Sequence, residues 1–268
     1  MNRRQRALLV QVTLYVVLAA AVAALALVAD WPVIKENFWN SDGIDWADGN
    51  WGDLITIGMV NTVKYTAIAF AGGLALGLVL ALMRLSPVAP YRWLATAYVE
   101  FFRGLPALVV MIFMSTGLPI AFGWTPPGGT VGAGLIGLIM VAGAYMAETL
   151  RAGIQAVPKG QTEAARSLGM RPGATTVKVV LPQAFRIVIP PLTNEFVLLI
   201  KDTALLFLLG AAASERELTS VAKDFLTSGP SAGTATSLIQ AALLYLVITL
   251  PLTQLVAWLE RRQRKAVR

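Results

Sequence analysis

Long runs of apolar residues with little or no charge constrain this chain more than any other feature of its sequence. The runs lie at about 7–29, 54–83, 95–120, 131–156, 189–213 and 237–259. A helix of about 20 residues crosses the hydrocarbon core of a bilayer, at ~1.5 Å per residue. Because 56% of the residues are hydrophobic and only 14% are charged, the chain is too apolar for a soluble domain. We therefore expect an all-α integral membrane protein with about six transmembrane helices.

The first run differs in length from the apolar core of a cleaved signal peptide. It follows a basic start, Asn2–Arg6, as a signal-peptide core would. The run reaches full spanning length, however, which favours a retained first helix. We expect residues 1–54 to form an extra N-terminal transmembrane helix and an acidic external segment, 55–260 the main transmembrane domain, and 261–268 a basic cytoplasmic tail.

The segment 30–53 carries six acidic residues, one lysine and four tryptophans. Tryptophans beside a span commonly lie at the level of the lipid headgroups, which we expect for Trp31 and Trp51. The alternative interpretation is a docking surface for an external protein.

The positions of the basic residues predict the orientation of the chain. If both termini and the polar loop at 158–182 are cytoplasmic, 15 of the 22 lysines and arginines lie inside. The outer segments then hold 3 basic residues against 9 acidic ones. This is the positive-inside pattern, so the net charge of +7 indicates topology and not a nucleic-acid surface.

Ionisable residues inside the spans are costly, and they mark structural or functional positions. Glu100 and Arg103 stand three residues apart in the third span, as do Glu148 and Arg151 in the fourth. Residues at that spacing share a helix face, so the members of each pair can neutralise each other. We expect a structural or gating role for both pairs near the cytoplasmic ends of their helices.

The fifth span carries adjacent opposite charges near its middle. Lys201 and Asp202 point about 100° apart around a helix, so they cannot simply pair with each other. Glu195 lies two turns before Asp202 on the same face. Transported substrates often bind near the bilayer midplane, and the candidate substrate contacts are Glu195, Lys201, Asp202 and Thr203. Bracing between helices, or gating, is the alternative role.

A polar stretch, Glu163–Pro182, interrupts the apolar runs. The stretch predicts two short helices joined by a turn, each too short to cross a bilayer. Thr162 can cap the first helix, Gly169 suits the left-handed residue that ends it, and Pro172 suits the first position of the second. A piece of this size can lie at the membrane surface and fit a groove on another protein.

This stretch resembles the EAA loop of ABC-transporter permeases. The loop's pattern is EAA, three residues, Gly, nine residues, an aliphatic residue, one residue and Leu-Pro. Here it is met by Glu163-Ala164-Ala165, Gly169, Val179 and Leu181-Pro182. Three further stretches resemble the polar amino-acid importer permeases: Phe102–Pro106, Ala144–Glu148 with Arg151, and Asn194-Glu195 followed by Leu199–Thr203. The resemblance covers roughly 55–260.

The resemblance implies a fold and a set of partners. The last five spans would form a type I importer core, and the loop at 158–182 would dock into a cytoplasmic ABC ATPase dimer through Glu163, Ala164, Ala165 and Gly169. The other implied partners are a second permease subunit (identical or homologous), an extracytoplasmic solute-binding protein, an amino-acid substrate and membrane lipid, with no nucleic acid. The ATPase would bind ATP and Mg, and this chain no cofactor or metal. The protein would lie in the bacterial cell membrane with both termini in the cytoplasm.

Missing residue types and motifs exclude several catalytic chemistries. The chain has no cysteine and no histidine, which removes the thiol nucleophile, cysteine metal sites and the commonest general base. It also has no Gly-x-x-x-x-Gly-Lys-Ser/Thr phosphate loop. We expect a non-catalytic transport subunit, with a secondary transporter driven by an ion gradient as the alternative. An extra first span and an acidic outer loop loosely resemble glutamate-type importers, so glutamate or glutamine is the favoured substrate and basic amino acids are the rival.

Overall fold

Helices form the fold throughout residues 3–46 and 48–266, which are the residues that the computed structural model describes. In chain order they are α1 (Arg3–Val28), α2 (Trp31–Phe38), α3 (Ser41–Ile44), α4 (Trp51–Asp53), α5 (Val60–Leu85), α6 (Ala89–Gly104), α7 (Ala107–Ile112), α8 (Leu118–Phe122), α9 (Gly129–Gln155), α10 (Lys159–Ser167), α11 (Pro172–Thr175), α12 (Leu181–Asp202), α13 (Leu218–Asp224) and α14 (Thr236–Ala266). Short π-helical segments lie at Leu54–Met59, Phe113–Gly117 and Thr176–Val180, and 3-10 turns at Thr203–Leu209 and Ala213–Glu215. The expected all-α class is confirmed.

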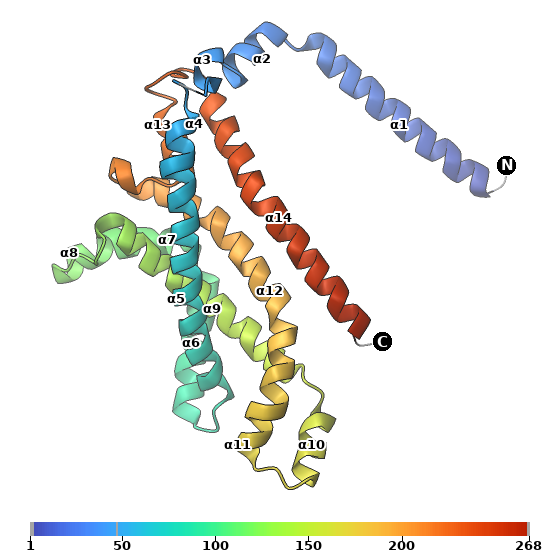
Figure 1. Ribbon diagram of the computed structural model, residues 1–268, viewed down its shortest axis with the longest axis vertical. Helices are drawn as coiled ribbons and strands as arrows, with labels where there is room; N and C mark the ends of the chain where they lie inside the picture. The colour runs from blue at the N-terminus through green and yellow to red at the C-terminus, as the bar shows by residue number, and fades with distance from the viewer. Residues whose placement is uncertain (1–2, 47, 267–268) are drawn as a thin grey trace.

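The central helix of the bundle is α9, which packs against α5, α6, α7 and α12 (Figure 1). Glycines let α5 approach it closely. A Cβ at Gly73 would lie 2.9 Å from the Cβ of Ala142, and one at Gly77 would lie 2.9 Å from the Cβ of Met146. Ala142 and Met146 belong to the buried core. The close approach of α5 to α9 therefore depends on glycine at these two positions.

Four helices among the described residues are long and apolar enough to cross a membrane. They are Leu8–Val28, Trp51–Leu85, Gly129–Gln155 and Thr236–Arg262. The pair Ala89–Gly104 and Ala107–Phe122 passes the same test when it is counted as one bent span. The structure therefore agrees with the expected first, second, fourth and sixth spans and differs at the third and fifth.

The expected continuous span at 95–120 is wrong, because the helix breaks at a proline. Helix α6 ends at Gly104 and α7 begins at Ala107, and the two segments differ in direction by 106°. Pro106 has no N–H to donate, and it holds Leu105 in an extended conformation. As a result α7 and α8 turn away to the side of the bundle (Figure 1).

The expected span at 189–213 also has different bounds. Helix α12 begins at Leu181 and ends at Asp202, where a 3-10 turn follows. Pro182 does not stop the helix, which passes from the π-helical segment Thr176–Val180 directly into α12. Its four charged residues, Arg186, Glu195, Lys201 and Asp202, explain why α12 is not one of the helices that pass the apolarity test.

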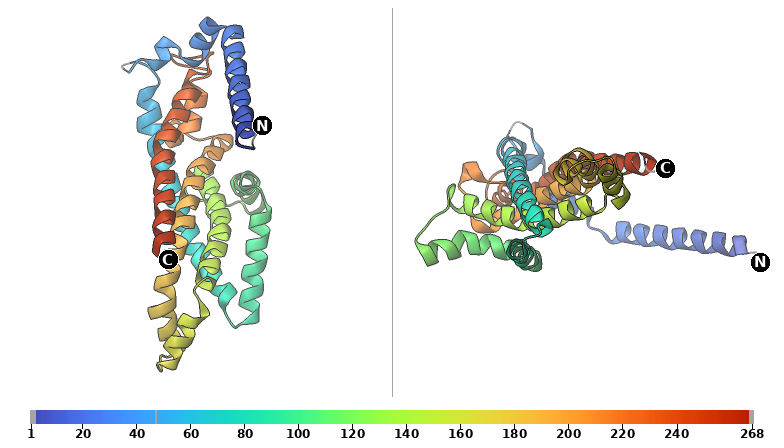
Figure 2. Two further views of the ribbon diagram at one scale, coloured as in Figure 1. Left: turned by 90° about the vertical axis from the view of Figure 1, so that its right-hand side faces the viewer. Right: turned by 90° about the horizontal axis from the view of Figure 1, so that it is seen from below.

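Hydrogen bonds attach the segment before α4 to the start of α14. The side-chain amide of Asn50 donates to Ser231 Oγ at 2.7 Å and to Gln240 Oε1 at 2.8 Å. The backbone N–H of Asn40 donates to Thr236 Oγ1 at 3.0 Å. These bonds hold α2 and α3 at the end of the molecule opposite α10 and α11 (Figures 1 and 2).

The two ends of the chain differ in their contacts. Helix α1 stands apart from the bundle, and its apolar window is 0% buried (Figure 2). The expected basic tail is not a separate element up to residue 266, because α14 continues as a helix to Ala266. Residues 267 and 268 of that tail, and residue 2 of the basic start, lie outside the described residues.

Candidate functional site

A cavity of about 380 Å³ lies where the helix break at Pro106 meets α9 and α12. Its walls come from three stretches that are far apart in the sequence: Leu105, Pro106 and Ala107; Leu138, Val141, Ala142 and Tyr145; and Glu195, Leu198, Leu199 and Asp202. The walls are mostly apolar with a few polar groups, which is the usual make-up of a small-molecule site.

Among the described residues, the acidic side chains that line this cavity are those of Glu195 and Asp202. They stand seven residues apart on α12 and are both half-buried. The expectation that they share a helix face is confirmed. Two carboxylates in a largely apolar cavity are suited to binding a positively charged group, such as an ammonium.

The structure does not bring the other two candidate contacts into this cavity. Lys201 belongs to the same helix, α12, but its side chain is exposed and does not line the cavity. Thr203 is fully buried, and its hydroxyl donates to the carbonyl of Ile200 at 2.7 Å. Thr203 therefore belongs to the turn that ends α12.

A cationic group lies beside the cavity. The guanidinium of Arg103 lies 5.5 Å from the centre of the Tyr145 ring, and the Tyr145 hydroxyl donates to the Arg103 carbonyl at 3.4 Å. Tyr145 itself lines the cavity, and Arg103 is near enough to Glu195 for their charges to interact. The cavity thus has carboxylates in its wall and a guanidinium close by.

The predicted pairing of Glu100 with Arg103 is wrong, and the pairing of Glu148 with Arg151 is confirmed. Arg84, at the end of α5, lies 3.9 Å from the Glu100 carboxylate and forms an ion pair with Glu148. Arg151 Nη2 lies 2.5 Å from Glu148 Oε1. Arg84 of α5 reaches the carboxylates of Glu100 in α6 and Glu148 in α9, so the network joins these three helices.

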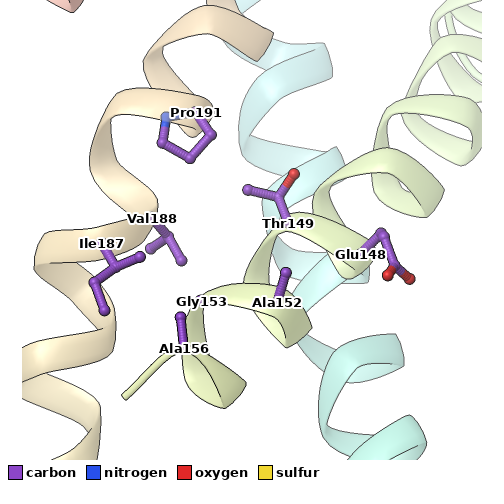
Figure 3. Close-up of a pocket in the computed structure, with 8 residues that line it drawn as sticks. All are labelled: Glu148, Thr149, Ala152, Gly153, Ala156, Ile187, Val188 and Pro191. Atoms are coloured by element: carbon purple, nitrogen blue, oxygen red, sulfur yellow. The ribbon is translucent and has the colours of Figure 1, made fainter. Parts of the chain in front are cut away.

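A second cavity, also of about 380 Å³, lies between α9 and α12 on the side of α10 and α11. Figure 3 shows Ile187, Val188 and Pro191 of α12 facing α9. The opposite wall consists of Glu148 and of residues with small or short side chains: Thr149, Ala152 and Gly153 of α9, and Ala156 directly after it. Because the side chains here are small, the two helices leave an apolar groove.

The loop at 158–182 protrudes from one end of the molecule (Figure 1). Glu163 and Ala164 are exposed on α10, while Ala165 is buried. Gly169 has φ +82°, so it takes the predicted left-handed conformation, and Pro172 opens α11 as expected. Leu168 is 85% exposed, an apolar side chain left uncovered at the tip of the loop.

Two details of the loop differ from the sequence prediction. Thr162 does not cap α10, because the helix already begins at Lys159 behind Pro158. The second short helix is not separate either, since α11 continues through the π-helical segment into α12. Pro172 falls in a first helical turn, where a proline does not break the helix, and Pro182 lies where the π-helical segment passes into α12.

Sequence reasoning missed Arg84 and Tyr145. Arg84 was counted only as a basic residue of a cytoplasmic turn, and its position at the end of an apolar run facing Glu148 was the available signal. Tyr145 lies in the stretch Ala144–Glu148, but its contact with Arg103 depends on how α6 and α9 pack, which spacing along one helix does not give.

Comparisons with known proteins cover most of the chain. Residues 73–265 match a family model described as "Binding-protein-dependent transport system inner membrane component". The probable glutamine ABC transporter permease protein of Bacillus subtilis is 40% identical over 78% of this chain and 93% of its own length. The glutamate/aspartate import permease protein of Escherichia coli is 35% identical over 76% and 91%.

A solved structure supports the fold. A chain from the crystal structure of an amino acid ABC transporter with histidines has a TM-score of 0.70 and 36% identity to this one. The match covers 79% of this chain and 95% of that chain.

Proposed function

This chain belongs to the family of inner-membrane components of binding-protein-dependent transport systems, and we propose that it carries glutamine or glutamate through the cavity at Glu195 and Asp202. It is a membrane-spanning permease subunit of an ATP-driven amino-acid importer. A partner ATPase hydrolyses the ATP, so this chain is not itself an enzyme. The alternative of a secondary transporter driven by an ion gradient does not hold for a member of this family.

The observation that carries the proposed path is the composition of the first cavity. An amino acid has an ammonium group, which Glu195 or Asp202 would bind, and a carboxylate, which Arg103 is placed to attract. The apolar walls exclude water, which strengthens both interactions. Lys201 and Thr203 do not line this cavity and are not among the proposed substrate contacts.

The choice of substrate rests on the relatives. The relative named for glutamine is 40% identical and the one named for glutamate/aspartate is 35% identical, whereas an arginine permease protein of Bacillus subtilis is 33% identical. The relative named for glutamine has the highest of these identities, which supports glutamine over arginine, and an L-cystine permease protein of Bacillus subtilis is 38% identical.

The loop at 158–182 is the proposed contact with the ATPase, which binds ATP and Mg. Glu163 and Ala164 are exposed on α10, and Gly169 permits the sharp turn to α11. The uncovered Leu168 at the tip supports a protein contact there, because an isolated apolar tip gains from burial in a groove.

Members of this family depend on a binding protein, so the proposed partners include an extracytoplasmic binding protein as well as the ATPase. A second permease subunit, identical or homologous, is proposed to cover the outer face of α12, where Ile189 and Leu198 are 44% and 42% exposed. With α10 and α11 in the cytoplasm, the acidic segment 30–53 faces outward and both termini lie inside. Residues 1–54 then form an addition to the importer core at 55–260.

Uptake by cells with and without this gene tests the proposal. Loss of labelled glutamine or glutamate uptake on deletion, with arginine uptake unchanged, is the expected result. The wild-type gene should restore uptake, and Glu163→Arg should not, because a reversed charge on α10 disturbs the ATPase contact. Unchanged uptake of both amino acids in the deletion strain would overturn the substrate assignment.

A further inference from the structure

Helix α12 joins the coupling loop to the first cavity without a break. Helices α11 and α12 and the π-helical segment between them follow one another from Pro172 to Asp202. The loop leads into the inner half of α12, and Glu195 and Asp202 lie in its outer half. Any movement of the loop therefore passes directly into the inner half of α12.

Two adjacent prolines divide α12 between these halves. Pro190 and Pro191 lie inside the helix, where neither can donate the usual hydrogen bond to the carbonyl four residues earlier. A proline in a helix interior is one of the recognised causes of a bend. The helix thus lacks two backbone donors within five residues of Glu195, between the loop and the cavity.

One tight contact holds α12 against α9 next to these prolines. A Cβ at Gly153 would lie 2.0 Å from Cγ1 of Val188, so only glycine allows this approach. Val188 is 2% exposed. The contact fixes one point of α12 against the central helix of the bundle.

The groove lies around that contact. Ala152 and Ala156 face Ile187 and Pro191 across about 380 Å³ of space (Figure 3). The groove therefore leaves space on α9 beside the contact between Gly153 and Val188, because the side chains of Ala152 and Ala156 are small.

We propose that Pro190 and Pro191 form a joint in α12, about which its inner half swings against the groove when the ATPase moves the coupling loop. Pro190, Pro191 and Gly153 are positioning residues, because they set the direction of the inner half of α12 and do not line the first cavity. This inference rests on the proposed coupling of the loop to an ATPase. It differs from a rigid α12 that rocks about the contact between Gly153 and Val188.

Spin labels distinguish a jointed from a rigid helix. The chain has no cysteine, so introduced cysteines are the only ones in it. Val177 and Leu198, on either side of the joint, are 61% and 42% exposed, and Val79 on α5 is 54% exposed and serves as the reference. Label pairs at Val177→Cys with Val79→Cys, and at Leu198→Cys with Val79→Cys, are compared in the assembled importer without nucleotide and with trapped ATP.

The expected shifts follow from helix geometry. The arm from Val177 to Pro190 is about 20 Å long, so a bend of about 20° moves its tip by roughly 7 Å. The distance from Val177 to Val79 should change on that scale, and the distance from Leu198 to Val79 should stay nearly constant. Comparable shifts at both sites overturn the joint and favour a rocking helix, and no shift at either site overturns it as well.

Two sets of variants test the same joint by function. Pro190→Ala with Pro191→Ala restores the backbone donors and should reduce the swing at Val177 and the amount of substrate taken up per ATP hydrolysed several-fold. Ala152→Leu and Ala156→Leu fill the groove and should act in the same way. Ala152→Ser, which adds one atom, and Ile154→Phe, which adds bulk outside the groove, are the matched controls.

These experiments distinguish an error in the proposed joint from an error in the proposed substrate. The label distances require only the ATPase and nucleotide, so they do not depend on which amino acid is carried. Normal coupling in the double-proline variant would overturn the joint while wild-type uptake still supports the proposed function. If wild-type uptake is also absent but the tip moves, the substrate assignment is the part that fails.

Discussion

Arg84 at the end of α5 forms an ion pair with Glu148 in α9, and Glu148 at the same time accepts a hydrogen bond of 2.5 Å from Arg151. One carboxylate thus serves two guanidinium groups from two helices. The side chain of Arg84 is 12% exposed and that of Glu148 is 26% exposed, so the pair is largely shielded from water.

Removing Arg84 should weaken the packing of α5 on α9. Arg84→Ala removes a charged hydrogen bond, and we expect it to lower the free energy of unfolding by about 2 kcal/mol. Arg84→Lys keeps the charge and should lose less. Thermal unfolding of the purified protein measures the difference, and equal stability of Arg84→Ala and the wild type would contradict the structural role.

The adjacent residues Lys201 and Asp202 should differ in their effect on transport. Asp202→Asn removes a carboxylate from the cavity, whereas Lys201→Met changes a side chain outside it. We expect uptake to fall roughly tenfold in Asp202→Asn and Glu195→Gln, the loss expected for about 1.4 kcal/mol of binding. Lys201→Met should retain most of the uptake. A larger loss in Lys201→Met than in Asp202→Asn would contradict the assignment of this cavity.

Alanine at Gly169 should disturb the coupling loop. Gly169 has φ +82°, a conformation that costs an L-residue about 1 kcal/mol. We expect Gly169→Ala to reduce copurification of the ATPase with this chain. Gly160→Ala is the control, because a Cβ there meets nothing within 4 Å and the backbone is helical. Equal ATPase recovery with both variants would show that the turn does not set the contact.

Asn50 should hold the outer segment to α14. Its amide is fully buried and donates to Ser231 and Gln240. Asn50→Ala leaves both acceptors short of a donor, which costs about 2 kcal/mol. The expected result is faster proteolysis between α2 and α4 in the folded protein. Gly52→Ala, where a Cβ meets nothing within 4 Å, should leave the cleavage rate unchanged.

Glu217 should make stability depend on pH. This residue caps α13, outside the membrane-crossing helices, and burial raises the pKa of its carboxyl above 4.5. Because the folded protein binds this proton more tightly than the unfolded chain, the contribution to stability is present below about pH 4.5 and is lost as the pH rises through the folded pKa. Thermal unfolding across that range should show a fall for the wild type that Glu217→Gln reduces. An identical pH profile for the two proteins would exclude Glu217 as its source.

The sequence was sufficient for the features that depend on local chemistry. The apolar runs predicted the all-helical membrane fold, and the seven-residue spacing of Glu195 and Asp202 placed them on one helix face. Gly169 and Pro172 predicted the turn of the loop, because their backbone preferences are intrinsic.

The predictions that were wrong concern the helix break at Pro106 and contacts between helices. The hydropathy of the stretch around Pro106 predicted one continuous span. Mean hydropathy does not depend on backbone hydrogen bonds, so it does not reveal the break caused by a proline that lacks an N–H. Glu100 was assigned to Arg103 by spacing within one helix, but Arg84 reaches it from another. The cavity itself is formed by residues from three stretches, and its shape is not encoded in any of them alone.

The bond between Asn40 and Thr236 joins residues 196 positions apart, and this has a consequence for how the protein is made. A ribosome inserting the chain from its N-terminus completes the outer segment long before it reaches α14. The segment 30–53 therefore has no partner on α14, and Asn50 has no bond to Gln240, until the last helix has been made. This contact can close only after α14 has been made, so a mutation that delays the insertion of α14 leaves the segment uncovered for longer.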